Sequence, residues 1–149
     1  MKRTFGWSVL VCVCVVSFAL SDDSGKAKEE GKKFQGTWKP VKAEIAGNPF
    51  PDEILKTMTL VITDDKYTVT VGERTDEGTT KLDPTKTPPT MDIKGTKGPN
   101  QGKTIPAIYE LTDTTLRVCY DLSGKEHPKE FKTKTGTQLF LVEYKRQKP

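Results

Sequence analysis

The sequence has 149 residues, which is enough for one domain but hardly for two. Hydrophobic residues make up 34% of it and aromatic residues 8%, so the core must be modest, and charged residues of both signs are interspersed at 30%. The formal net charge of +4 comes without a basic helix or an interleaving of basic and aromatic residues, which argues against nucleic-acid binding.

Residues 1–19 have the pattern of a secretory signal peptide. A basic start precedes an apolar run over residues 5–20, and Ser17 and Ala19 place small residues at the spacing of a signal-peptidase site. The run is shorter than the stretch of about 20 apolar residues that a membrane-spanning helix usually needs. We expect cleavage after Ala19 and an extracytoplasmic product, periplasmic or secreted, without stable membrane insertion; an uncleaved anchor is the alternative.

Removal of the leader changes the charge and the cysteine count. Lys2 and Arg3 leave with it, so the formal net charge falls from +4 by these two charges to +2. Cys12 and Cys14 also leave, and Cys119 remains alone. A single cysteine cannot form an internal disulfide, so the exported domain must depend on its core for stability.

A polar segment over residues 20–33 separates the leader from the domain. It is rich in lysine and glutamate and is interrupted by Gly25 and Gly31. We predict a flexible tether with a single helical turn before Phe34, and we place the domain at residues 34–149.

From Trp38 onward, β-branched and aromatic runs alternate with turn-forming residues, which predicts strands. The expected strands cover residues 37–45, 59–63, 67–71, 78–82, 90–95, 104–111, 115–122, 130–135 and 138–146. One helix is expected over residues 51–56, where Pro51 occupies the first position and two acidic residues follow in the first turn.

The connections between the expected strands are short and turn-like. Short links favour antiparallel neighbours, because parallel strands need long crossovers. An antiparallel meander of this size closes most naturally into a barrel, since closure removes exposed edges. We therefore predict an all-β protein, an eight- to nine-stranded antiparallel up-and-down barrel with one short helix.

The face of the first strand on which Trp38 lies is not obvious from alternation alone. Strict alternation would put it opposite Val41, Ala43 and Ile45, the later apolar face of the first strand. Pro40 removes a donor from the ladder, so we expect a bulge there that returns Trp38 to the inner face. A buried indole must satisfy its N–H group, and a backbone carbonyl at the barrel base is the expected acceptor.

The glycine–any residue–tryptophan motif of Gly36, Thr37 and Trp38 resembles the opening motif of lipocalins and fatty-acid-binding proteins, the calycin group. In that group a basic residue near the end of the last strand packs over the tryptophan. Lys145 or Arg146 of "EYKR" occupies the matching position. The resemblance thus implies structural roles for Gly36, Trp38 and one of these two basic residues.

A broader resemblance covers nearly the whole mature chain. The stretches "FQGTWKPVKAEIAGNPFPDE", "KLDPTKTPPTMDI", "GKTIPAIYELTDTTLRVCYD" and "KEFKTKTGTQLFLVEYKR" look like an uncharacterised family of exported, lipocalin-like bacterial domains expanded in planctomycetes. This resemblance implies a calycin-type barrel and no particular activity. The chain departs from true lipocalins because it has no disulfide and no long helix near its C-terminus.

No set of residues predicts catalysis, a metal or a cofactor. The single histidine, His127, lies in the turn-like stretch "GKEHPKEF", and Cys119 is expected to be a small packed residue rather than a nucleophile. Asp64 and Asp65 lack the spacing of metal ligands and are typical of a turn. The glycine-rich "GTKGPNQGK" has no helix behind it, so it is not a phosphate-binding loop. We expect a protein that is not an enzyme.

Two functions of different kinds remain. The first is the binding of one small apolar or amphipathic molecule inside the barrel, although the same inward side chains could equally fill the core. Arg117 would meet an acidic headgroup if it faced inward. The expected lining residues are Trp38, Tyr67, Val69, Tyr109, Arg117, Val118, Tyr120 and Phe140.

The second is a protein-interaction or inhibitor module with a filled core that acts through its loops. The candidate surfaces are the proline-rich residues 82–90 and the loops at 96–103 and 123–129. The lean core favours this alternative, whereas the calycin resemblance favours the first. The sequence names neither a ligand nor a protein partner.

Overall fold

The computed structural model describes residues 23–149, so the predicted signal peptide at residues 1–19 lies outside the described part of the chain. The described residues form two helices, α1 (Asp23–Phe34) and α2 (Asp52–Thr57), and nine strands. The strands are β1 (Gly36–Ile45), β2 (Asn48–Pro49), β3 (Met58–Thr63), β4 (Lys66–Val71), β5 (Arg74–Asp83), β6 (Thr90–Lys97), β7 (Thr104–Leu111), β8 (Thr115–Asp121) and β9 (Leu139–Arg146). Neither described helix combines the length and the apolar character that crossing a membrane would need.

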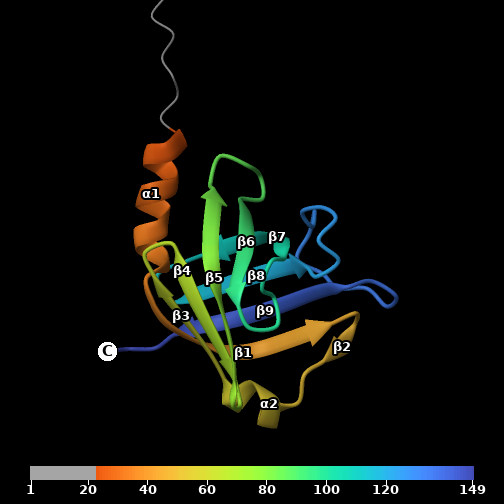
Figure 1. The fold of residues 1–149 in the computed structure, drawn as a ribbon. Coiled ribbons are helices and arrows are strands. Elements are labelled where there is room, and N and C mark those ends of the chain that lie inside the picture. The colour runs from red at the N-terminus through yellow and green to blue at the C-terminus, as the bar shows by residue number, and fades with distance from the viewer. Residues whose placement is uncertain (1–22) are drawn as a thin grey trace, which may run out of the picture.

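Eight of the strands close into an antiparallel barrel. β1 and β3 to β9 are neighbours in chain order, and β9 returns to pair with β1 from Trp38↔Arg146 to Ile45↔Phe140. The short β2 pairs with the end of β1, beyond the point where β3 leaves it. In Figure 1, β3 to β6 run upright, across the direction of β8, β9 and β1. The all-β barrel predicted from the sequence is confirmed, with two helices rather than one.

The connection between β8 and β9 differs from the prediction. The segment 130–135, which was predicted as a strand, is not one. Other predictions hold: β7, for example, has its predicted bounds, residues 104–111. Both edges of β9 are already paired, with β8 and with β1, so the segment 130–135 has no free edge to join. It is tied instead to the end of β1, because Thr133 Oγ1 accepts from the Gly47 N–H at 2.9 Å and donates to Glu44 Oε1 at 2.6 Å.

The segment expected as a tether forms a helix of twelve residues, α1. Its lysines and glutamates are good helix formers, and the pairs Glu29–Lys32 and Glu30–Lys33 lie at 3.7 and 3.3 Å on its surface. These preferences outweigh the two glycines that suggested flexibility. Only Phe34 of this helix is buried, and α1 runs alongside β5 (Figure 1).

A β-bulge in β1 brings Trp38 to the inner face of the barrel. The register between β1 and β9 shifts between Pro40 and Lys42, and the extra residue, Val41, is 46% exposed. Trp38 before the bulge and Ala43 after it are both buried. The bulge expected at Pro40 is confirmed, whereas the expectation that Val41 shares a face with Ala43 is wrong, because Val41 is itself the bulged residue.

Trp38 lies beneath Arg146 at one end of the barrel. Its side chain is 0% exposed, and its Nε1–H donates to the backbone carbonyl of Phe34 at 2.9 Å, as expected of a buried indole. The guanidinium carbon of Arg146 lies 4.1 Å from the centre of the indole ring, which is a cation–π contact. Lys145, the other basic residue considered for this position, is exposed.

The Arg146 guanidinium also joins two separate parts of the chain. It donates hydrogen bonds to the backbone carbonyls of Lys33 at 2.6 Å, Asp113 at 2.8 Å and Gln35. Gly36 makes room for it, because its φ is +123° and a Cβ atom there would lie 3.3 Å from the guanidinium. A lysine could not replace this planar group, whose several N–H donors have fixed directions.

We predict that Trp38→Ala lowers the free energy of unfolding by about 3–5 kcal/mol, because it removes a fully buried aromatic side chain and leaves a cavity under Arg146. The measurement is urea unfolding followed by circular dichroism. Val61→Ala is the matched control, since Val61 is 37% exposed on β3, and it should change stability by less than about 0.5 kcal/mol. Equal losses in the two variants would contradict the role assigned to Trp38.

Candidate ligand-binding site

The barrel is filled at the Trp38 end and hollow toward the opposite end. Phe34, Trp38 and Tyr109 fill the closed end, where Phe34 meets Tyr109 edge-on with 5.0 Å between ring centroids. Beyond them lies a cavity of about 350 Å³. Val71 and Leu122, 36% and 37% exposed, lie at its mouth.

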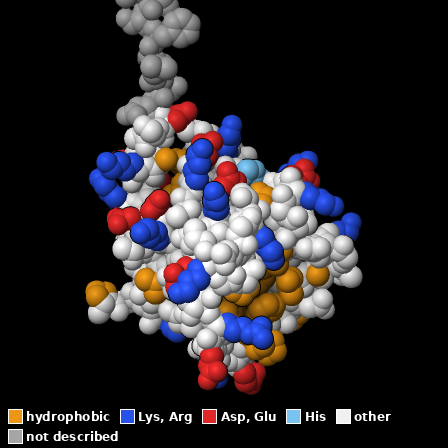
Figure 2. All heavy atoms as spheres, in the orientation of Figure 1, with side chains coloured by type: hydrophobic (Ala, Val, Ile, Leu, Met, Phe, Trp, Pro, Cys, Tyr) orange, Lys and Arg blue, Asp and Glu red, His pale blue; other side chains and the backbone are white. Residues whose placement is uncertain are grey.

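Most of the cavity wall is apolar. Alternation along each strand turns every second side chain inward, and aliphatic residues from five strands supply these positions. They include Leu60, Ile62, Val69, Ile93, Ile105 and Val118. Figure 2 shows the largest group of hydrophobic side chains on this face at the lower right of the molecule, over β1 and β9, with smaller groups elsewhere. An exposed apolar patch of this kind is typical of a binding site.

The structure separates the eight residues expected to contact a ligand into three groups. Trp38 and Tyr109 lie in the packed closed end and do not line the cavity. Arg117 lies on the outside of the barrel. The five residues that do line the cavity are Tyr67, Val69, Val118, Tyr120 and Phe140.

Arg117 cannot meet a ligand inside the barrel. Its neighbours Leu116 and Val118 are the buried, inward residues of β8, so alternation turns Arg117 outward. There it bonds to the Glu110 carboxylate and lies 4.4 Å over the ring of Phe131. The expectation that it could meet an acidic headgroup is therefore wrong.

Arg74 is the basic residue at the cavity that the sequence analysis missed. It begins β5 opposite Val71, at the mouth. The expected strand there covered only residues 78–82, because the preceding "RTDE" is polar and carries no alternating pattern. These polar residues nevertheless pair with β4, so β5 begins at Arg74.

A hydrogen-bonded cluster holds the β6–β7 loop against the cavity wall. Asp76 accepts from the Tyr67 hydroxyl at 2.9 Å, from the Asn100 backbone N–H at 3.0 Å and from the Asn100 side-chain amide at 2.9 Å. Burial, then the hydrogen bond to Asp76 and its charge, raise the pKa of Tyr67. The loop at 96–103, predicted as an interaction surface, thus contributes Pro99 and Asn100 to the cavity.

Aromatic side chains form the wall of the cavity near β8 and β9. Tyr120 and Phe140 stack with ring centroids 5.7 Å apart, and Phe50 lies against Phe140 at 5.4 Å. The hydroxyls of Tyr120 and Tyr144 lie 3.4 Å apart. Burial raises the pKa of Tyr144 to about 12, and burial followed by the nearby Tyr144 raises that of Tyr120.

The other two candidate loops meet on the outer surface. Residues 82–90 and the stretch that contains His127 line a shallow depression outside the barrel. His127 Nε2 lies 2.8 Å from Asp92 Oδ1, and both side chains are nearly half exposed, at 40% and 47%. The single histidine is therefore outside the cavity and forms an exposed pair with a carboxylate.

Cys119 is buried on the outer side of the barrel. Its Sγ lies 3.7 Å from the Lys132 carbonyl in the β8–β9 connection. Burial raises the pKa of Cys119 to about 11, so the thiol is protonated at neutral pH and a poor nucleophile. Within residues 23–149 no cluster of three or more histidine, cysteine, aspartate or glutamate side chains could hold a metal ion.

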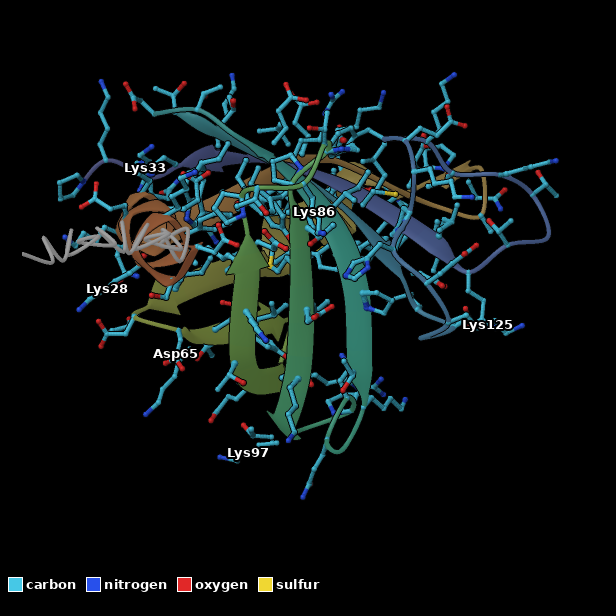
Figure 3. The ribbon with its side chains drawn as sticks, turned by 90° about the horizontal axis from the view of Figure 1, so that it is seen from above. Lys28, Lys33, Asp65, Lys86, Lys97 and Lys125 are labelled. Carbon is cyan, nitrogen blue, oxygen red and sulfur yellow. The ribbon has the colours of Figure 1, made fainter. Side chains whose placement is uncertain are left out.

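Basic side chains are dispersed over the surface. Figure 3 shows Lys28, Lys33, Lys97 and Lys125 pointing outward from different sides of the molecule. Lys97 and Lys33 each lie near a glutamate, at 3.5 and 3.3 Å. Two of these four lysines thus have an acidic neighbour, and the four do not lie in a single basic stripe.

The fold is similar to that of a solved structure. No protein-family model matches the chain, and no curated protein matches it. The crystal structure of a DUF4847 family protein from Bacteroides vulgatus is similar over 81% of this chain and 99% of that one, with 16% sequence identity and a TM-score of 0.49.

We predict that the tyrosines resist ionisation while the protein is folded. All four, Tyr67, Tyr109, Tyr120 and Tyr144, have a raised pKa with burial as the largest cause. Ultraviolet absorbance should detect almost no phenolate up to a pH of about 11, whereas the chain in urea should titrate near a pH of about 10.

The sign of the effect on stability follows from these shifts. Folding raises the pKa, so above the unfolded value the folded state keeps protons that the unfolded chain releases, and stability falls as the pH rises. Half of the phenolate signal appearing near a pH of about 10, with the circular dichroism unchanged, would contradict the burial of these side chains.

Proposed function

We propose that this protein binds one small apolar or amphipathic molecule inside the barrel, as a lipocalin-like binding protein, and that it does so without catalysis. The observation that carries the proposal is the apolar cavity of about 350 Å³ with an open mouth. Ligand sites typically have volumes of about 300–1,000 Å³. The volume near the lower limit favours a compact ligand over a long acyl chain.

The distribution of side-chain size supports binding over a filled core. The bulky Phe34, Trp38 and Tyr109 fill the closed end. The lining of the hollow part includes aromatic residues such as Tyr120 and Phe140, but positions 69 and 118 hold valines, where larger side chains could have filled the space. A protein interior is normally packed with few voids larger than a water molecule, so an apolar space of this size is consistent with an occupant.

The polar groups of the cavity support binding rather than chemistry. The Asp76 carboxylate already accepts three hydrogen bonds, from Tyr67 and Asn100, and it fixes a loop. A general base needs a lone pair directed at its substrate. His127 and Cys119, the residues considered for nucleophilic catalysis, do not line the cavity.

The proposal extends to an extracytoplasmic protein, on the leader pattern of residues 1–19. Outside the cytoplasm the domain would hold its ligand without a disulfide, since Cys119 is the one cysteine after the leader. Stability would then depend on the packed closed end.

The cavity can be blocked by one substitution. In Val69→Trp the added indole would occupy the cavity, whereas in Val61→Trp the same side chain would point outward from the neighbouring strand. We predict that wild type and Val61→Trp bind the uncharged dye N-phenyl-1-naphthylamine with saturable, enhanced emission. Val69→Trp should bind it at least about tenfold more weakly, a change of about 1.4 kcal/mol.

Equal dye binding by both tryptophan variants would place the dye outside the cavity and contradict the proposal. An absence of saturable binding by the wild-type protein, to this dye and to a panel of other apolar compounds, would favour the interaction module with a filled core. Circular dichroism and urea unfolding would establish that each variant is folded.

A further inference from the structure

Two tyrosine hydroxyls meet inside the cavity. Tyr120 on β8 and Tyr144 on β9 lie on either side of the cross-strand pair Val118↔Val142 and share its inward face. Their hydroxyls are only 3.4 Å apart, so both side chains lean over this valine pair toward each other. Both residues line the cavity.

This pair has an unused hydrogen-bond donor. Each phenol carries one O–H group, and the single contact between them uses one of the two. Among the described residues neither hydroxyl has a second hydrogen-bond partner, and the contact of 3.4 Å is long for an O–H···O bond. A buried donor without an acceptor is costly, so a ligand that supplies an acceptor gains binding energy here.

The opposite wall offers no comparable donor. The Tyr67 hydroxyl and the Asn100 amide both donate to Asp76. These groups are committed to holding the β6–β7 loop. The buried Tyr109 hydroxyl also has no hydrogen-bond partner in the described part of the chain, but Tyr109 does not line the cavity. Among the tyrosines that line it, the Tyr120–Tyr144 pair is therefore the one that remains open to a ligand.

The charges around the cavity exclude an anionic group at this point. Among the described residues that line the cavity, Arg74 is the one basic residue and Asp76 the one acidic residue. Arg74 lies at the mouth, paired with Val71 in the β4–β5 hairpin. A carboxylate at the tyrosine pair would be buried without a cation beside it, which is strongly unfavourable. A neutral acceptor carries no such penalty.

We propose that the ligand is a compact, uncharged molecule with an aromatic or alicyclic body and a carbonyl oxygen that accepts a hydrogen bond from the Tyr120–Tyr144 pair. This specificity rests on the proposed function of the cavity. The body of the ligand would lie against Tyr120 and Phe140, which line the cavity and on which a flat ring can stack.

Three naphthalenes test this assignment by calorimetry on the folded protein. 2-Acetylnaphthalene carries a carbonyl, 2-isopropenylnaphthalene replaces its oxygen with CH₂ at nearly the same shape, and 2-naphthoate carries a negative charge. We expect wild type to bind the ketone about five- to tenfold more tightly than the alkene, the contribution of one net hydrogen bond. Naphthoate should bind more weakly than the ketone. In the Tyr120→Phe/Tyr144→Phe double variant the preference for the ketone should disappear while the alkene still binds.

The outcomes distinguish the specificity from the proposed function. Equal binding of ketone and alkene by wild type would overturn the specificity and leave the cavity-binding function intact. A tighter binding of naphthoate would also overturn it and would assign recognition to Arg74. An unchanged ketone preference in the double variant would place the carbonyl elsewhere. No binding of any of the three by wild type would overturn both proposals. The wild-type comparison decides the matter even if the double variant does not fold.

Discussion

The packing of Trp38 between the Phe34 carbonyl and the Arg146 guanidinium is the contact on which the rest of the barrel depends. A single arginine covers the indole ring and bonds to backbone carbonyls from the end of α1, from the residue between α1 and β1, and from the β7–β8 turn. It thereby joins the first and last strands of the barrel where they pair at Trp38↔Arg146. Closure here satisfies polar groups that a barrel end would otherwise leave unpaired.

Closing one end with aromatic side chains determines where the barrel is hollow. Phe34, Trp38 and Tyr109 fill only the closed end, so the shape of the mouth depends on other interactions, among them the bonds from Tyr67 and Asn100 to Asp76. At the start of the β8–β9 connection, Asp121 accepts hydrogen bonds from the backbone N–H groups of Ser123 and Glu126. Burial acts to raise the pKa of Asp121, but its hydrogen bonds outweigh burial and lower the pKa overall. Polar bonds thus hold the mouth in shape without filling it, which suits a binding site.

The features that were predicted correctly depend on local sequence pattern. The features that were missed depend on contacts between residues far apart in the sequence. The alternation of apolar and polar residues predicted the strands, and Pro40 predicted the bulge that turns Trp38 inward. The segment 130–135 has the composition of a strand, but it finds both edges of β9 occupied. Arg117 was considered for the ligand on the condition that it faced inward, and the structure shows that it faces outward. Arg74 was missed because its polar strand has no apolar alternation. No pattern in one sequence reveals whether inward side chains meet or leave a cavity between them.

The central claim is that the barrel is packed at the Trp38 end and hollow beyond it. Methyl NMR spectra recorded under xenon pressure test this most directly, because xenon enters apolar cavities large enough to hold it. The account predicts saturable shifts for the methyl groups of Val69 and Val118, which line the cavity, and none for those of Val41 and Val61 on the outer surface. Interior methyl groups that do not respond to xenon would contradict it and would indicate a filled barrel.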